Sequence, residues 1–133
     1  MVQIDQPLLT SSIAGKERVT RVNGQGKYAV TDFALLEAND EVSIVRASPR
    51  TGRTHQIRVH ARWARHPLVG DTRYGDQTLD QTSGIEGRLM LHAAELQIPA
   101  LGDRPAIHAK APMDEDFLLK VNASFSTRSY YIQ

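Results

Sequence analysis

The stretch Pro49-Arg-Thr-Gly-Arg-Thr-His-Gln-Ile-Arg-Val-His60 is the part of the chain that most constrains its fold. It predicts a helix over residues 54–64, which ends before Pro67 because a proline excludes the preceding residue from the α conformation. At about 100° per residue, one stripe of roughly 80° collects four side chains: His55, Arg58, Arg62 and Arg65. A helix that is apolar elsewhere and cationic on one stripe is typical of an element that packs into a domain and shows one face to a ligand.

Charge is distributed unevenly along the chain. The 133 residues carry 16 Lys and Arg against 15 Asp and Glu, a net charge of +1. No acidic residue lies between Glu41 and Asp71, where six arginines give a local charge of +6 and leave −5 for the rest. Arginine without lysine indicates recognition of planar phosphates or bases, and the alternative is a solvated basic face.

Length and composition exclude several classes of protein. A chain of 133 residues predicts one modest domain. Without cysteine there is no disulfide, no thiolate zinc site and no cysteine nucleophile. The sequence has no apolar run of membrane-spanning length, and its start, MVQIDQPLLT, lacks the basic and apolar regions of a signal peptide. We therefore expect a cytoplasmic protein with no membrane partner.

The elements expected along the chain are mostly short strands. Turn residues separate apolar, β-branched and aromatic runs, which predicts strands at residues 4–9 and 17–22 and hairpins pairing 28–36 with 42–47 and 89–98 with 105–111. In the second hairpin Ile107, Ala109 and Ala111 alternate with polar residues, which indicates one buried side. The predicted fold class is α+β, with a mixed, mainly antiparallel sheet and a few helices.

A second helix is predicted over residues 115–123. Asp114 is a suitable N-cap, and acidic residues in the first turn suit the helix dipole. Its expected buried side is formed by Phe117, Leu118 and Val121. Elsewhere, Trp63 is interpreted as a core residue, and His92 and His108 as structural histidines. Tyr74 is open to two interpretations, loop packing or stacking on a base.

The quoted stretch, with His66-Pro-Leu-Val-Gly-Asp71 and Arg73-Tyr-Gly75, resembles the RluA family of RNA pseudouridine synthases. The family pattern is close to P-x-T-G-R-T-H-Q-I-R-V-H, then G-H-P-[IV]-x-G-D and Y-G, and so many fixed types make the match specific. Residues 27–31, 89–96 and 111–112 resemble flanking family motifs. We interpret residues 1–125 as the C-terminal portion of a pseudouridine synthase catalytic domain. Residues 126–133 are interpreted as a tail, disordered or specific to this protein.

The resemblance implies a reaction: isomerisation of a uridine to pseudouridine in ribosomal or transfer RNA, with no cofactor and no metal. Family members use an aspartate nucleophile on an H-R-L-D-x-x-T-S-G stretch, paired with the arginine of the Q-[IL]-R step, here Arg58. A guanidinium suits this task because it stays protonated and binds a carboxylate through two hydrogen bonds. The resemblance also implies RNA or pocket contacts at Arg53, His55 and Gln56, and phosphate contacts at Arg62 and Arg65.

The main departure from the family is that the chain contains no H-R-L-D-x-x-T-S-G stretch. A smaller departure is Arg65, which stands where the family often has Gly before His-Pro. Asp71 belongs to the G-D loop, where we expect it to bind backbone or an arginine rather than act as the nucleophile. We therefore expect the 133 residues alone to be an inactive fragment. The alternatives are a non-catalytic RNA-binding module, and a half-domain that associates with the missing N-terminal half or with a second copy.

Overall fold

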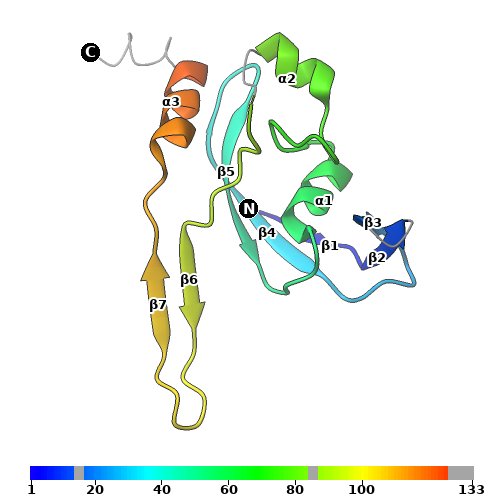
Figure 1. Ribbon diagram of the computed structural model, residues 1–133, viewed down its shortest axis with the longest axis vertical. Coiled ribbons are helices and arrows are strands. Elements are labelled where there is room, and N and C mark those ends of the chain that lie inside the picture. Colours follow the sequence, from blue (N-terminus) through cyan, green and yellow to red (C-terminus); the bar gives the residue numbers. More distant parts are fainter. Residues whose placement is uncertain (14–16, 84–86, 126–133) are drawn as a thin grey trace. The chain divides into compact units, whose positions relative to one another are not determined.

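The computed structural model describes residues 1–13, 17–83 and 87–125 (Figure 1). The chain divides into two units, Met1–Leu89 and Met90–Gln133. The expectation for a tail at 126–133 lies outside the described residues. Among the described residues, no helix is long and apolar enough to cross a membrane.

The first unit is built on a three-stranded antiparallel sheet in the order β1-β4-β5. Its strands are β1 (Val2–Asp5), β4 (Val30–Ala38) and β5 (Ser43–Pro49). The predicted pairing of the last two is confirmed. Asn39 forms the turn between them, since its side-chain oxygen accepts hydrogen bonds from the backbone N–H groups of Glu41 and Val42, at 2.9 Å each.

A second antiparallel pair in this unit joins β2 (Leu8–Ile13) and β3 (Glu17–Val22). The single strand predicted over residues 4–9 is therefore wrong, because the structure divides it between β1 and β2. The division falls at Gln6 and Pro7, where the proline ring has no N–H with which to continue a ladder.

Two helices follow the sheet strands of the first unit, α1 (Gln56–Trp63) and α2 (Gln77–Ser83). The predicted first helix is confirmed but shorter, since His55 takes a left-handed conformation with φ of 53° and acts as N-cap. The second helix was not predicted, because its polar sequence has no apolar periodicity. Its one available signal was Asp76, whose side chain accepts a hydrogen bond from the Leu79 N–H at 3.1 Å.

The core of the first unit is small and partly polar. Its apolar centre contains Leu8, Ala29, Val59 and Tyr74. Beside it lie several buried polar side chains: Thr20, Thr31, Asp32, Gln56, His60 and Asp71. The expectation of a buried Trp63 is wrong: its side chain is 48% exposed at the last residue of α1. Trp63 is the last residue of α1, and the residues that this helix buries are Gln56, Val59, His60 and Ala61.

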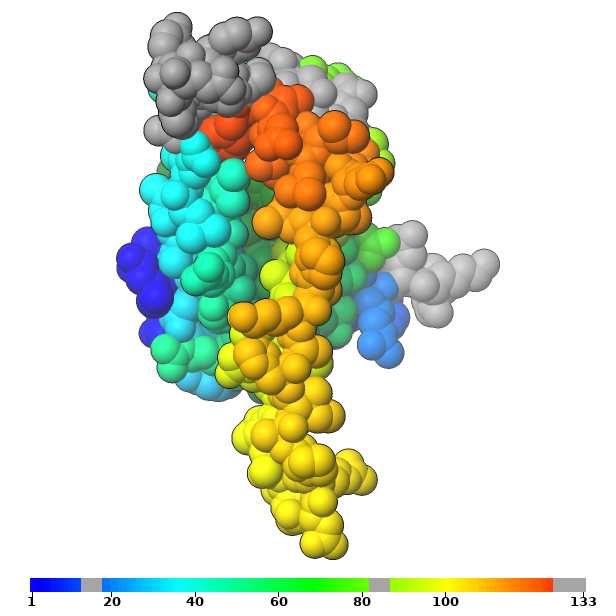
Figure 2. Space-filling model, turned by 90° about the vertical axis from the view of Figure 1, so that its left-hand side faces the viewer, coloured from blue at the N-terminus to red at the C-terminus, as the bar shows by residue number. Residues whose placement is uncertain are grey.

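The second unit contains a hairpin of β6 (Glu95–Ile98) and β7 (Ile107–Lys110), followed by α3 (Glu115–Ser124). Both predicted elements are confirmed, and the Asp114 side chain caps α3 by accepting from the Phe117 N–H at 2.8 Å. The predicted burial is wrong. Every residue of the two strands is exposed, and α3 has no buried residue. Figure 2 shows side chains of the hairpin, coloured yellow to orange, on the molecular surface. A two-stranded hairpin has no second layer of its own to cover its apolar side.

Candidate active site

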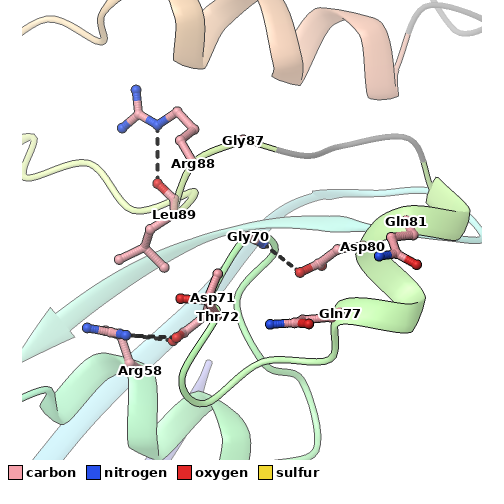
Figure 3. Close-up of a pocket in the computed structure, with 10 residues that line it drawn as sticks. All are labelled: Arg58, Gly70, Asp71, Thr72, Gln77, Asp80, Gln81, Gly87, Arg88 and Leu89. Atoms are coloured by element: carbon pink, nitrogen blue, oxygen red, sulfur yellow. Dashed lines mark hydrogen bonds and ion pairs between the residues drawn. The ribbon is translucent and has the colours of Figure 1, made fainter.

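The centre of the site is an ion pair between α1 and the loop that follows it (Figure 3). The Nε and Nη2 atoms of Arg58 donate to the two carboxylate oxygens of Asp71, at 2.9 Å and 2.8 Å. The Asp71 side chain is 0% exposed and that of Arg58 19% exposed. Two parallel, charge-assisted hydrogen bonds between a buried carboxylate and a partly buried guanidinium fix the position and the orientation of the guanidinium.

Asp71 is also fixed by its own loop. Its Oδ1 accepts from the backbone N–H groups of Arg73 at 3.1 Å and Tyr74 at 3.0 Å. Burial acts to raise the pKa of Asp71, but the hydrogen bonds from Arg58 and from these two amides outweigh burial, so the pKa lies below its ordinary value. The same hydrogen bond raises the pKa of Arg58. Both groups are therefore charged, and the expectation that Asp71 binds backbone and an arginine is confirmed.

Tyr74 covers one face of the Arg58 guanidinium, with 5.0 Å between the guanidinium carbon and the ring centroid. Its hydroxyl accepts from the Thr20 N–H at 3.0 Å and shares a hydrogen bond with Nδ1 of His55 at 2.7 Å. The ring is 5% exposed, so the structure supports loop packing for Tyr74. Burial first, and then the positive charges of Arg58 and Arg73, lower the pKa of His55.

Two glycines allow the loop to follow this path. Gly70 has a φ of +77°, and a Cβ there would lie 1.7 Å from the Arg88 carbonyl oxygen. A Cβ at Gly75 would lie 2.3 Å from the Asp71 carbonyl oxygen. Neither position has space for a side chain, which accounts for the glycines in the G-D and Y-G parts of the motif.

A buried polar network joins α1 to β4. Gln56 donates to the Val30 carbonyl and to the Thr31 hydroxyl, at 2.9 Å each, and its Oε1 accepts from the Thr51 hydroxyl at 2.7 Å. The Thr31 hydroxyl lies 2.8 Å from Nδ1 of His60, whose Nε2 lies 2.9 Å from the Gln6 carbonyl. A carbonyl only accepts, so Nε2 carries a proton and donates to Gln6. The lowered pKa of the ring favours its neutral form at pH 7. Burial first lowers the pKa of His60, and the bond to Gln6 only partly opposes this.

Beside the ion pair lies a cavity of about 410 Å³. Arg58, the loop residues 70–72 and three polar side chains of α2 line it, and Gly87, Arg88 and Leu89 complete the lining (Figure 3). The α2 side chains are Gln77, Asp80 and Gln81. Asp80 accepts from the Gly70 N–H at 3.0 Å, which joins α2 to the loop of the ion pair. The cavity therefore places a charged guanidinium beside amide and carboxylate groups.

The structure separates the residues of the predicted cationic stripe. Only Arg58 and Arg62 lie on α1, whereas His55 precedes it and Arg65 follows it with a φ of 66°. Arg62 and Arg65 are exposed, and Arg62 donates to the Tyr74 carbonyl at 3.0 Å. Arg53 is half-buried and its Nε donates to the Tyr28 carbonyl at 2.8 Å.

Gln56 lies in the interior, 4% exposed. Besides the bonds above, its Oε1 accepts from the Arg53 N–H at 3.0 Å, so both polar atoms of its amide have partners inside the protein. Sequence reasoning placed Gln56 among RNA contacts and did not identify this network. The available signal was its position two residues before Arg58, which turns it to another side of the helix.

Comparison with known proteins agrees with the motifs. No family model matches the chain. It is 42% identical over 116 residues to ribosomal large subunit pseudouridine synthase C of Escherichia coli (strain K12), which covers 84% of this chain and 36% of that protein. The protein of the same name in Pasteurella multocida (strain Pm70) is 38% identical over 115 residues. The chain is homologous to pseudouridine synthases of the RluA family over 84% of its own length. It spans about a third of the length of these curated RluA-family relatives, 36% and 35%.

Solved structures agree with this family. The human RNA pseudouridylate synthase domain containing 1 matches with a TM-score of 0.68 and 36% identity, over 84% of this chain and 48% of that one. The human domain containing 4 matches with the same TM-score at 23% identity, over 92% of this chain and 56% of that one, which shows the fold. The predicted α+β class with mainly antiparallel strands is confirmed. In this chain, five residues of the motif hold the site together: Thr51, Gln56, His60, Asp71 and Tyr74.

Proposed function

We propose that this chain is part of the catalytic region of an RNA pseudouridine synthase. The reaction breaks the glycosidic N–C bond of a uridine, turns the uracil, and forms a C–C bond to the ribose. Sequence relationship supports the reaction class, since the relatives are named pseudouridine synthases. The observation that carries the proposal to a residue is the partly buried guanidinium of Arg58, which is paired with a fully buried carboxylate at the edge of a cavity.

Arg58 is proposed as the partner of the nucleophilic aspartate. Its raised pKa keeps it protonated, so it holds a neighbouring carboxylate in the ionised form that attacks. Asp71 is unsuited to be that nucleophile, because its side chain is 0% exposed and both its oxygens already accept hydrogen bonds. We therefore propose that the nucleophile comes from an H-R-L-D-x-x-T-S-G segment outside these 133 residues, which alone are inactive.

RNA contacts are proposed at the exposed cations around α1. Arg62 and Arg65, exposed at the C-terminal end of the helix, suit phosphates, while Arg53 and His55 lie half-buried at its start. For Gln56 we propose a structural task in place of an RNA contact, since its amide is engaged inside the protein. Because the curated relatives are named for the large ribosomal subunit, we propose ribosomal RNA as the substrate and the cytoplasm as the location.

Exposed apolar side chains favour a partner for the second unit. Leu96, Ile98 and Ile107 are 56%, 44% and 51% exposed, and the register places Ile98 opposite Ile107. We propose that the rest of the catalytic domain, rather than a second copy, is this partner. Sedimentation of the 133 residues alone as a monomer supports this choice, and a stable dimer contradicts it.

The test compares two proteins for release of tritium from ribosomal RNA labelled at C5 of uridine. C5 loses its hydrogen when it bonds to the ribose, so release measures isomerisation. We expect none from the 133 residues alone, and release when they are fused behind the segment of an RluA-family member that carries H-R-L-D-x-x-T-S-G. Release by the 133 residues alone contradicts the proposed missing nucleophile.

A fused protein that folds and binds RNA but releases no tritium supports the alternative, a non-catalytic RNA-binding module. In that case binding falls steeply with salt and is weakened by Arg62→Ala. Trp63→Leu is a matched control, because Trp63 is the next residue, is similarly exposed and carries no charge.

A further inference from the structure

The bond between Arg58 and Asp71 uses only one edge of the guanidinium. An arginine has five N–H groups arranged as a planar fork. Asp71 takes the edge formed by Nε and Nη2, with one hydrogen bond to each. The three remaining N–H groups, two on Nη1 and one on Nη2, have no hydrogen-bond partner among residues 1–13, 17–83 and 87–125. A second bidentate edge of the same cation is thus available beside the cavity.

Asp71 is suited to hold the first edge without moving. Its side chain is fully buried, and its Oδ1 accepts from two loop amides as well as from Arg58. The close approaches at Gly70 and Gly75 leave the loop little freedom to change its path. The two hydrogen bonds to Asp71 fix the plane of the guanidinium. The Tyr74 ring covers one face of that plane and restricts tilting toward it. The Nη1/Nη2 edge of Arg58 would change direction only if Arg58, Asp71 and Tyr74 moved together.

We propose that Asp71 is a positioning residue, which grips Arg58 from the side and so directs its Nη1/Nη2 edge toward a second carboxylate. This inference rests on the proposed function, in which that carboxylate is the nucleophile. Asp71 itself contacts neither the substrate nor the reacting atoms. One guanidinium then serves two carboxylates with different tasks: the buried one orients it, and the other reacts.

The first test uses the complete 133-residue chain and acetate as the probe for a carboxylate. In ¹⁵N spectra of arginine side chains, assigned with Arg58→Lys, hindered rotation of a gripped guanidinium should give Arg58 separate Nη signals. The exposed Arg46 in the same sample should give averaged ones. Acetate should shift the Nη signals of Arg58 and leave its Nε signal in place. Averaged Nη signals for Arg58, or a shift of Nε, would overturn the proposed grip.

The second test measures catalysis in the fused protein described above. Asp71→Asn keeps the size of the side chain and removes its charge, and we expect a loss of roughly 10²-fold in kcat with little change in KM, the scale for a misplaced catalytic group. Asp116→Asn is the matched control, because it makes the same change in an ion pair with Lys120 on α3, outside the site, and it should leave kcat unchanged. A folded Asp71→Asn protein with unchanged kcat contradicts the proposal.

The two tests separate this inference from the proposed function. If the fused wild-type protein releases no tritium, the proposed function fails, while the acetate titration still decides whether Asp71 directs the second edge. If Asp71→Asn does not fold, as judged by circular dichroism, the wild-type titration decides alone.

Discussion

The two units of the chain contain similar elements but use them differently. In the first unit, polar side chains from separate segments form hydrogen bonds with one another in the interior. Arg58 binds Asp71, and His60 binds Thr31. In the second unit, the hairpin and the capped helix form with no buried residue among positions 90–125. Local signals are therefore enough to form helices and strands, whereas a site needs long-range contacts that take polar groups out of water.

Burial of polar groups makes the first unit sensitive to change. A buried donor or acceptor without a partner costs about 1–3 kcal/mol. Among the described residues, no buried side-chain nitrogen or oxygen lacks a hydrogen bond. Substitutions in the first unit should therefore have much larger effects than matched substitutions in the second.

Glycines offer the largest expected contrast. Gly70→Ala places a Cβ 1.7 Å from a backbone oxygen at a φ of +77°, so we expect a loss of about 3 kcal/mol or more in the free energy of unfolding. Gly102 has a φ of +55° but open space around it, and Gly102→Ala should cost only about 1 kcal/mol. Urea unfolding of both variants measures the difference, and equal costs would remove the distinction between the units.

Histidines offer a second matched pair. His60→Ala removes a buried ring and leaves the Thr31 hydroxyl and the Gln6 carbonyl without this partner, so we expect a loss of about 2–4 kcal/mol. The exposed His108 bonds the exposed Glu95 through its Nε2, and His108→Ala should leave the free energy of unfolding almost unchanged. A tolerated His60→Ala, measured by the same unfolding experiment, would show that the network does not stabilise the unit.

Stability should depend on pH through His55 and His60. Both have a pKa below the ordinary 6.5 in the folded protein, so below pH 6.5 the unfolded chain binds more protons. The contribution of these two histidines to the free energy of unfolding should be fully present above about pH 7, and the free energy should fall as the pH is lowered toward 5. Urea midpoints at several pH values test this, and His60→Gln should flatten the curve. A stability that rises on acidification would contradict the neutral assignment.

The smallest expected effect is at the start of α3. Asp114→Ala removes the side chain that accepts from the Phe117 N–H, which should cost about 1 kcal/mol of helix stability. Amide hydrogen exchange along α3 should accelerate, while exchange in α1 stays unchanged. Accelerated exchange in both helices would show that the two units unfold together.

The parts predicted from the sequence were those governed by local chemistry. The hairpin turn at Asn39, the proline after α1 and the Asp114 cap are signals read within a few residues. Burial in the second unit was predicted wrongly from alternation, because a pattern shows which side is apolar and not whether anything covers it. The polar α2 gave no periodic signal at all.

The candidate site shows the same contrast between features that local sequence predicts and features that depend on long-range contacts. The motif identified Arg58, and the G-D loop suggested an arginine or backbone partner for Asp71. Two contacts depend on how the loop folds back and were not predicted. Arg58 pairs with Asp71, 13 positions further along the chain. The Tyr74 hydroxyl accepts a hydrogen bond from the backbone N–H of Thr20, 54 positions earlier. The left-handed conformations of His55 and Arg65 likewise depend on the surrounding structure. They place both residues outside α1, so the predicted stripe of four side chains on one helix does not form.

The most direct test of the central claim is kcat for tritium release by the fused protein with Arg58→Lys, which keeps the charge and removes the bidentate fork. The control is Arg46→Lys, since Arg46 is exposed on β5 and does not line the cavity. We predict a fall of roughly 10²-fold or more for Arg58→Lys and no change for Arg46→Lys. An Arg58→Lys protein with the kcat of wild type would contradict the claim that this guanidinium holds the nucleophile.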